Sequence, residues 1–279
     1  MKRFALSRTG IAVAASALSL ALATGCSDSG SGSDDSDKAG GSDKSTAAAK
    51  ALSASELKSR IIATGDVDGY KVGAADQTAG FASSKDDVTV VDEKCEPLAY
   101  VLTGFAPGDS AAFVNRMLSE QAASPSASST KSMEDMTDEE FEEAMKNITG
   151  ALGQTVTIVS LSSYEGEGAQ KTMSSVSDAI KGCASGFTAT PKGGAKDDTE
   201  KFTKVEAEKA SGTGDESLAF AVAGDADGDD VVVHCEVVRH GSTIATYYAF
   251  SLAAFSGEDG AGDYEIPAEI IKAQAAKLA

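Results

Sequence analysis

The two histidines of the chain, His234 and His240, are the first candidates for catalysis, because histidine is the usual general base near neutral pH. A hydrolase would also need a serine or cysteine nucleophile and an orienting acid. His234 is expected on a strand and His240 in a tight turn, and no Gly-x-Ser-x-Gly motif occurs in the sequence. We therefore predict no catalytic residues and a protein that is not an enzyme, with an envelope hydrolase as the least favoured reading.

Acidic residues are concentrated in Asp225-Ala226-Asp227-Gly228-Asp229-Asp230, which resembles the first half of an EF-hand calcium loop. This run has no glutamate at the far end of the loop and is expected between two strands, so we predict a solvated hairpin loop. Asp66-Val67-Asp68-Gly69 is typical of a turn. No phosphate loop or zinc motif occurs. The sequence therefore predicts neither a metal nor a cofactor.

The first of the four cysteines, Cys26, belongs to a different kind of motif. Lys2, Arg3 and Arg8 precede an apolar run over residues 11–23 that ends in Ala23-Thr24-Gly25-Cys26, a pattern typical of a secretory signal. The closing tetrapeptide resembles a bacterial lipobox, in which the cysteine is acylated, for example with palmitate. We predict a lipoprotein signal peptide over residues 1–25 and lipidation of Cys26. The alternative is an ordinary signal peptide with an incidental cysteine.

The residues after Cys26 predict a tether rather than a folded segment. Residues 26–50 are rich in Ser, Gly and Asp, and we expect a disordered linker that leaves the domain lipid-anchored to the cell membrane on its extracellular face. The whole chain has a net charge of -19, with 24 basic and 43 acidic residues. That balance argues against nucleic-acid binding, because phosphate neutralisation needs a basic surface.

Three consecutive strands form the centre of the predicted domain, over residues 217–223, 231–239 and 243–252. A two-residue turn at His240-Gly241 would pair Val237 with Ile244 and Cys235 with Thr246 on an apolar face. The opposite face would pair His234 with Tyr247 and Glu236 with Ala245. We expect this face to be the wetter one, open to a ligand or partner.

Other segments are expected to cover and extend this sheet. Ser53 and Glu56 have capping-box spacing before a helix that runs through Ile61 and Ile62 to about Gly65. Further expected elements are a strand over 88–91, a helix from Cys95-Glu96-Pro97, a strand over 114–118, a mobile insertion at about 119–136, a helix from Thr137 to about Gly150, a strand over 155–164, a helix from Gly168 to Cys183, a strand near Phe202 and Val205, and a last helix from Pro267. The fold class is α+β, with one domain over residues 51–279.

The three cysteines after Cys26 leave one thiol unpaired in any intramolecular arrangement. Cys183 lies on the core-facing stripe of its helix and Cys235 on the apolar face of its strand, so these two could pair. Cys95, at a helix start, could reach either. A buried cysteine in an apolar strand has no reason to ionise, so we predict that Cys235 is not a thiol nucleophile.

Short motifs along the chain resemble a known family. They are Thr155-Val156-Thr157-Ile158 through Tyr164-Glu165-Gly166, the helix ending at Cys183, Gly214-Asp215-Glu216-Ser217, and residues 237–245 around Arg239-His240-Gly241. These resemble actinobacterial lipoproteins related to the extracellular sensor domain of the mycobacterial receptor kinase PknH. The resemblance implies an α+β domain with a central antiparallel sheet and a cleft for an unknown ligand. It also implies a disulfide between Cys95 and Cys183, with Cys235 left free.

The predicted function is non-enzymatic binding of an unknown small molecule or envelope protein by a monomeric, membrane-anchored domain. We expect the site on the polar sheet face and its rim, near Tyr164, His234, Arg239 and Tyr247. The competing interpretation is that His234 and Tyr247 merely cover the sheet. An alternative function is a lipid or glycolipid carrier, which would need an internal apolar cavity.

Overall fold

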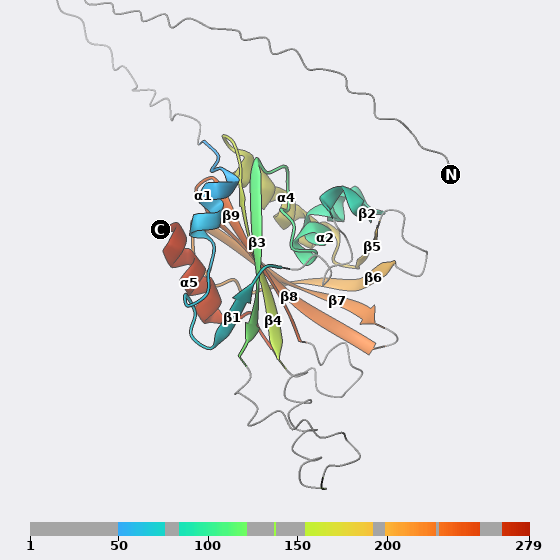
Figure 1. The fold of residues 1–279 in the computed structure, drawn as a ribbon. Helices are drawn as coiled ribbons and strands as arrows, with labels where there is room; N and C mark the ends of the chain where they lie inside the picture. The colour runs from blue at the N-terminus through green and yellow to red at the C-terminus, as the bar shows by residue number, and fades with distance from the viewer. Residues whose placement is uncertain are drawn as a thin grey trace, which may run out of the picture. The chain divides into compact units, whose positions relative to one another are not determined.

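An antiparallel sheet of nine strands forms the centre of the fold described by the computed structural model (Figure 1). The structure describes residues 50–75, 84–121, 137, 154–191, 199–226, 229–251 and 264–279. The strands are β1 (Tyr70–Gly73), β2 (Val88–Val90), β3 (Ala112–Glu120), β4 (Thr155–Ser163), β5 (Phe187–Pro191), β6 (Glu200–Glu208), β7 (Glu216–Ala226), β8 (Asp229–His240) and β9 (Thr243–Ser251). Their order across the sheet is β1-β3-β4-β9-β8-β7-β6-β5-β2.

Helices pack on both faces of this sheet, which confirms the α+β class. The helical segments are α1 (Ala54–Arg60), α2 (Glu96–Leu102), α4 (Gly168–Gly182) and α5 (Ala268–Leu278), with short 3-10 turns η2 (Lys85–Asp87) and η3 (Glu93–Cys95). In Figure 1, α1 and α5 lie on one side of the sheet and α2 and α4 on the other. We call the side with α2 and α4 the first face and the side with α1 and α5 the second face. Among the described residues, no helix is long and apolar enough to cross a membrane.

The three central strands form as predicted, but β7 and β8 extend into the acidic run predicted to be a hairpin loop, because Asp225 pairs with Asp230. The register of the second hairpin is also different. The predicted turn at His240-Gly241 is wrong, because His240 pairs with Thr243 and the turn consists of Gly241 and Ser242. Gly241 has φ 61, which suits the first central position of a hairpin turn. Val237 therefore pairs with Thr246 instead of Ile244. The shift is two residues, so every side chain keeps its predicted face.

The first face carries the larger apolar core. Odd-numbered residues of β8, from Val231 to Val237, pack there against α2 and α4, together with the large buried side chains Leu98, Met173 and Phe220. The Cys95–Cys183 disulfide joins the start of α2 to the end of α4, with its Cα atoms 6.0 Å apart. This bond confirms the pairing that the family resemblance implies, and Cys235 is the buried free cysteine of the described chain.

The second face is not the wet surface that the sequence predicts. Val238, Ala245 and Tyr247 are fully buried there in a second core, under Ile270 of α5 and Leu57 of α1. The prediction fails because α1 and α5, at opposite ends of the described domain, both dock on this face. Such long-range contacts leave no local trace in the strand sequence. The polar residues Glu236 and His234 lie at the margin of this cover rather than on an open face.

Several predicted boundaries change by a few residues. The Ser53–Glu56 capping box is present, but α1 ends at Arg60, where Ile61 turns to an extended conformation, rather than near Gly65. The predicted start of the insertion, at about residue 119, is too early, because Ser119 and Glu120 still pair with neighbouring strands in β3. The rest of the predicted insertion, residues 122–136, lies outside the described residues. The short strands β1 and β5 are absent from the predictions. The helix predicted from Thr137 to Gly150, the signal peptide over 1–25 and the linker up to residue 49 lie outside the described residues, apart from Thr137 itself.

Candidate functional site

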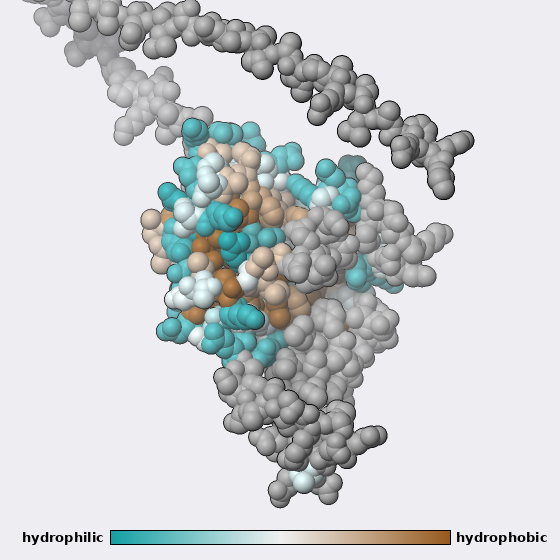
Figure 2. Space-filling view, viewed as in Figure 1, coloured by the Kyte–Doolittle hydropathy of each residue, from teal (hydrophilic) through white to brown (hydrophobic). Residues whose placement is uncertain are grey.

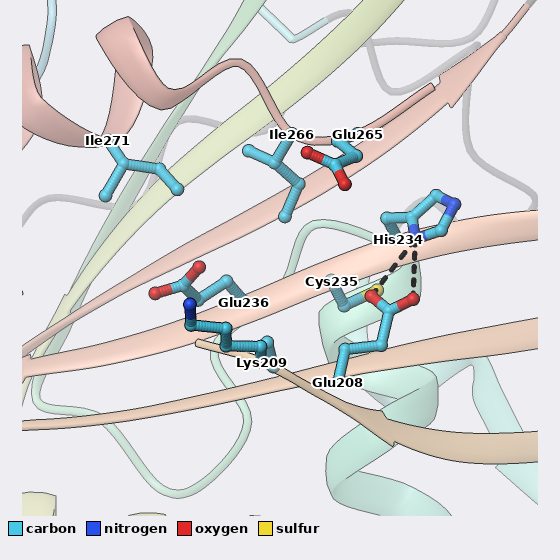
Figure 3. Close-up of a pocket in the computed structure, with 9 residues that line it drawn as sticks. Glu208, Lys209, His234, Cys235, Glu236, Glu265, Ile266 and Ile271 are labelled. Atoms are coloured by element: carbon cyan, nitrogen blue, oxygen red, sulfur yellow. Dashed lines mark hydrogen bonds and ion pairs between the residues drawn. The ribbon is translucent and has the colours of Figure 1, made fainter. Parts of the chain in front are cut away.

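A pocket of about 330 Å³ opens on the second face, beside the part of the sheet that α5 covers (Figure 3). Glu208 of β6 and His234 and Glu236 of β8 line it, with Ala219 of β7 between the two strands and Lys209 directly after β6. The chain just before α5 contributes Glu265 and Ile266. Figure 3 shows Ile266 and Ile271 on one side of the pocket and Glu208 and Lys209 on the other. Two isoleucines thus face Glu208 and Lys209 across the pocket, and Glu265 lies beside Ile266.

His234 and Glu208 form the closest polar pair in this pocket. The register puts Glu208 opposite Ala219, and Ala219 opposite Glu236, so Glu208, Glu236 and His234 share one face of the sheet. The Nδ1 atom of His234 lies 3.1 Å from each carboxylate oxygen of Glu208. Its ring also meets the ring of Tyr264 edge-on, with 5.0 Å between centroids. These contacts orient the imidazole, whose Nε2 has no hydrogen-bond partner among the described residues.

Tyr264 holds the rim of the pocket in place. Strands β8 and β9 pair from His240 to His234 and separate beyond that point. The hydroxyl of Tyr264 donates a hydrogen bond to the carbonyl oxygen of Val232, in the part of β8 that β9 no longer pairs with. Burial is the main cause that raises the pKa of Tyr264 well above its ordinary value. Tyr264 therefore stays neutral and remains a donor.

Glu236 is a buried carboxylate at the other end of the pocket. Only 4% of this residue is exposed. Its Oε1 accepts a hydrogen bond from the backbone N–H of Ser211 at 3.0 Å and another from the Ser211 hydroxyl. A buried charge needs such partners to offset its loss of hydration. The loop after β6 is thereby fastened to β8, and one oxygen of Glu236 is left without a protein partner among the described residues.

The charges around the pocket favour a positively charged or hydrogen-bond-donating ligand. Among the described residues, the carboxylates of Glu208, Glu236 and Glu265 line it beside a single cation, Lys209, which forms no ion pair within that part of the chain. Carboxylates accept hydrogen bonds, and protonated amines donate them. Ile266 and Ile271 offer contact to an aliphatic portion of the same ligand. Among the described residues, no group of three or more His, Cys, Asp or Glu side chains is arranged to hold a metal ion.

The structure does not bring the four predicted binding residues together. His234 lines the pocket, and Tyr247 lies on the same face but is 0% exposed beneath the helices of the second core. Tyr164 belongs to the first core and is 1% exposed, with its hydroxyl 3.0 Å from that of Ser162. Burial raises the pKa of Tyr164 to about 12. Neither tyrosine therefore offers a hydroxyl to solvent.

Arg239 points away from the pocket because it is five residues from His234. Side chains alternate along a strand, so an odd separation puts the two on opposite faces. Arg239 also has partners of its own: Nη1 lies 3.0 Å from Oδ2 of Asp215, and Nε lies 3.4 Å from Oε2 of Glu216. Binding by Tyr164, Arg239 and Tyr247 stays a prediction, and the pocket adds Glu208, Lys209, Glu265 and Ile266, which the sequence interpretation did not name.

Of these additional residues, Glu208 alone has a signal in the sequence, which is the alternation within β6. Glu206 and Glu208 are two residues apart and therefore share a face, and Lys204 forms an ion pair with Glu206 at 2.7 Å. That pattern marks a charged strand face but does not say which strand lies beside it. The pairing of β6 with β7 was needed to place Glu208 next to His234.

Cys235 lies on the first face of β8, in the first core, with 0% exposure. Burial raises the pKa of its thiol well above the ordinary value. A thiol that stays protonated is a poor nucleophile. The side chain therefore acts as a small apolar group in the core.

One solved structure relates this fold to a known protein. The extracellular domain of PknH from Mycobacterium tuberculosis aligns with 82% of this chain and 97% of its own residues, with a TM-score of 0.44 and 12% sequence identity. The structural resemblance that the sequence motifs predict is therefore confirmed. No protein-family model matches the chain, and no curated protein sequence matches it either.

Proposed function

We propose that this protein is an envelope lipoprotein, anchored to the extracellular face of the cell membrane through Cys26, whose α+β domain binds a small ligand without catalysis. The signal-like N-terminus and the lipobox pattern support the anchor. The observation that carries the binding role is the pocket beside His234, where carboxylates from β6, β8 and the chain before α5 converge. Its volume lies within the range of small-molecule sites.

The ligand that fits this lining carries a protonated amine next to an aliphatic group. The amine would lie between the Glu208–His234 pair and the partly free carboxylate of Glu236, and the aliphatic group would contact Ile266 and Ile271. Lys209, on the same side of the pocket as Glu208, disfavours a ligand with a high positive charge. A monovalent amine is therefore the best match to the pocket.

Native mass spectrometry of the mature domain, purified gently from its own envelope, tests this proposal. We expect a discrete non-covalent adduct whose mass identifies the ligand. The adduct should be lost in Glu208→Gln and in His234→Ala, because both remove the oriented pair. Glu206→Gln is the matched control, since Glu206 is an exposed glutamate of the same strand that does not line the pocket. A bare wild-type domain, or an adduct retained in both pocket variants, would contradict binding at this site.

Lipidation has its own test. The wild-type protein should enter the membrane fraction, and its N-terminal peptide should carry the mass of acyl chains on Cys26. Cys26→Ser should release the protein from membranes, whereas Cys235→Ser should not, because Cys235 lies in the first core. Membrane attachment that survives Cys26→Ser would show that the anchor is something else.

A lipid or glycolipid carrier is the second candidate. It needs an enclosed apolar cavity large enough for acyl chains. Three hollows with walls of described residues are open to solvent, and the described lining of the pocket beside His234 includes four charged residues besides His234. An adduct with the mass of a lipid in the experiment above would favour the carrier over the amine-binding domain.

A further inference from the structure

A second hollow, away from the pocket beside His234, lies between α1 and β3. It has a volume of about 510 Å³ and is lined by three residues of α1 and four of β3: Ala54, Ser55, Lys58, Phe113, Val114, Asn115 and Arg116. We call it the α1–β3 groove. Figure 2 shows this side of the molecule, where apolar patches lie between hydrophilic ones over α1 and β3.

The groove exists because β1 is shorter than β3. β1 pairs with β3 only from Met117 to Glu120, whereas β4 pairs with β3 from Ala112 onward. Among the described residues, the first half of β3 therefore has a strand on one side only. Val114 and Arg116 point to the second face, and Phe113 and Asn115 to the first, yet all four line the groove. The groove thus wraps around the uncovered edge of β3.

The charge of the groove is opposite to that of the chain. Of the described residues that line it, only Lys58 and Arg116 are charged, in a protein with 24 basic and 43 acidic residues. Arg116 is half-buried, and its guanidinium donates one hydrogen bond, from Nη1 to the backbone oxygen of Asn115 at 2.8 Å. Neither cation forms an ion pair with a described residue. Arg239, by comparison, is held by two carboxylates.

A guanidinium whose other N–H donors have no partner among the described residues is chemically suited to an oxyanion. Its planar N–H groups match the geometry of a carboxylate or phosphate, which they can bind with two parallel hydrogen bonds. Lys58 adds a second positive charge from the opposite wall, and the amide of Asn115 and the hydroxyl of Ser55 add hydrogen-bonding groups. The apolar side chains of Phe113 and Val114 leave room for a non-polar portion of the same molecule.

We propose that the α1–β3 groove is a binding site for an oxyanion group, carboxylate or phosphate, attached to an apolar portion. This site is separate from the amine-binding pocket, shares no residue with it and does not depend on it. Arg116 is the principal anion-binding residue, and Lys58 supports it through its charge.

Isothermal titration of the folded domain with phenyl phosphate and with benzoate tests the proposal. We expect both probes to bind and phenol, which lacks the anion, not to bind. Binding should weaken as salt rises, because screening reduces the attraction between exposed charges. In the double variant Lys58→Met/Arg116→Met, the affinity for the anionic probes should fall at least tenfold, while the thermal unfolding midpoint shows that the domain is still folded.

The control is Arg60→Met/Lys272→Met, which removes one arginine and one lysine that are exposed on α1 and α5 and do not line the groove. This variant should bind the probes as the wild type does. An equal loss of affinity in both double variants would show a general charge effect and overturn the proposal. So would unchanged binding in Lys58→Met/Arg116→Met.

A soluble ligand and a membrane headgroup could both supply the oxyanion, and vesicle sedimentation separates them. Vesicles of phosphatidylcholine with phosphatidylglycerol should pull down the wild-type domain if the groove takes lipid phosphate, and Lys58→Met/Arg116→Met should abolish this. Binding of the soluble probes without binding of the vesicles assigns the groove to a soluble ligand. If neither the vesicles nor the probes bind, the proposal is wrong.

Discussion

At the scale of single residues, the backbone at Gly214 lies so close to β8 near Arg239 that only glycine fits there. Gly214 has φ +69, and a Cβ atom there would lie 2.5 Å from the carbonyl oxygen of Arg239 and 2.7 Å from a methyl carbon of Val238. Gly212, two residues earlier, has nearly the same φ of +73 but open space around it. The two positions therefore separate the cost of the backbone conformation from the cost of a clash.

Substitution of these two glycines should have unequal effects. Gly212→Ala should lower the free energy of unfolding by about 1–2 kcal/mol, the usual cost of a left-handed conformation for alanine. Gly214→Ala should cost clearly more, because the loop must also move off β8. Urea unfolding of the two variants checks this. Equal losses would show that the loop around Gly214 moves away without cost.

His240 should make the stability depend on pH. Burial is the main cause that lowers the pKa of His240 below its ordinary value of 6.5, and its Nε2 has no hydrogen-bond partner in the described part of the chain. As pH falls through about 6.5, the unfolded chain takes up a proton at His240 that the folded chain does not. The contribution of His240 to the free energy of unfolding is therefore fully present above this pH and is lost as the pH falls below it.

The measurement for His240 is a comparison of urea unfolding at pH 8 and pH 5.5. The free energy of unfolding of the wild type should fall more between these pH values than that of His240→Asn, which cannot take up the proton. The carboxylates titrate in both proteins and cancel in the comparison. A pH dependence that is the same in both would exclude His240 as the cause.

At the scale of elements, polar contacts from α5 hold α1 and its following loop to the second face. The buried amide of Gln274 accepts from the N–H of Ile62 and donates to the carbonyl oxygen of Arg60, each at 2.9 Å. Lys277 lies 2.7 Å from Asp66, in the turn after α1. The hydroxyl of Tyr70 donates to Glu269 at 3.0 Å. Helix α5 thus satisfies backbone groups that the end of α1 exposes.

Gln274→Leu should be strongly destabilising although it replaces a polar residue in a core with an apolar one. The N–H of Ile62 and the carbonyl of Arg60 would lose their partner in a buried place, at a cost of roughly 1–3 kcal/mol for each unpaired group. Lys272→Ala, on the exposed side of α5, should change stability by less than about 0.5 kcal/mol. Thermal and urea unfolding measure both. A Gln274→Leu variant as stable as the wild type would show that α1 is not held by this contact.

At the scale of the whole domain, the sheet separates two cores that are stabilised differently. The first core, under α2 and α4, is crossed by the Cys95–Cys183 disulfide, which joins residues 88 positions apart. The described part of the second core has no disulfide and relies on apolar packing and the α5 contacts. Reduction of the Cys95–Cys183 disulfide therefore removes a crosslink from the first core and leaves the contacts of the second core in place.

Removal of the disulfide should destabilise the domain by about 2–5 kcal/mol, because the crosslink restricts the unfolded chain. The double variant Cys95→Ser/Cys183→Ser, compared with wild type by urea unfolding without reductant, gives this value. Alkylation of the unreduced wild type should label only Cys235 of the three domain cysteines, and only after denaturant exposes it. Labelling of Cys95 or Cys183 would contradict the pairing.

The amino-acid sequence alone determined what depends on neighbours along the chain. The alternation in β8 and β9 assigned every side chain of these strands to its face, and Ser53 with Glu56 specified the start of α1. The disulfide followed from the family resemblance and not from the residues themselves, which left all three pairings of Cys95, Cys183 and Cys235 open. Of the four proposed binding residues, only His234 was placed in the pocket.

The tertiary structure decided what depends on residues far apart in the sequence. The conversion of the second face into a core needed α1 and α5 to dock from opposite ends of the domain. The site needed β6 to pair with β7, which brings Glu208 to His234 across 26 residues. Hydrophobic periodicity shows that a strand or helix has an apolar side, but not which element covers that side, because many partners bury the same area equally well.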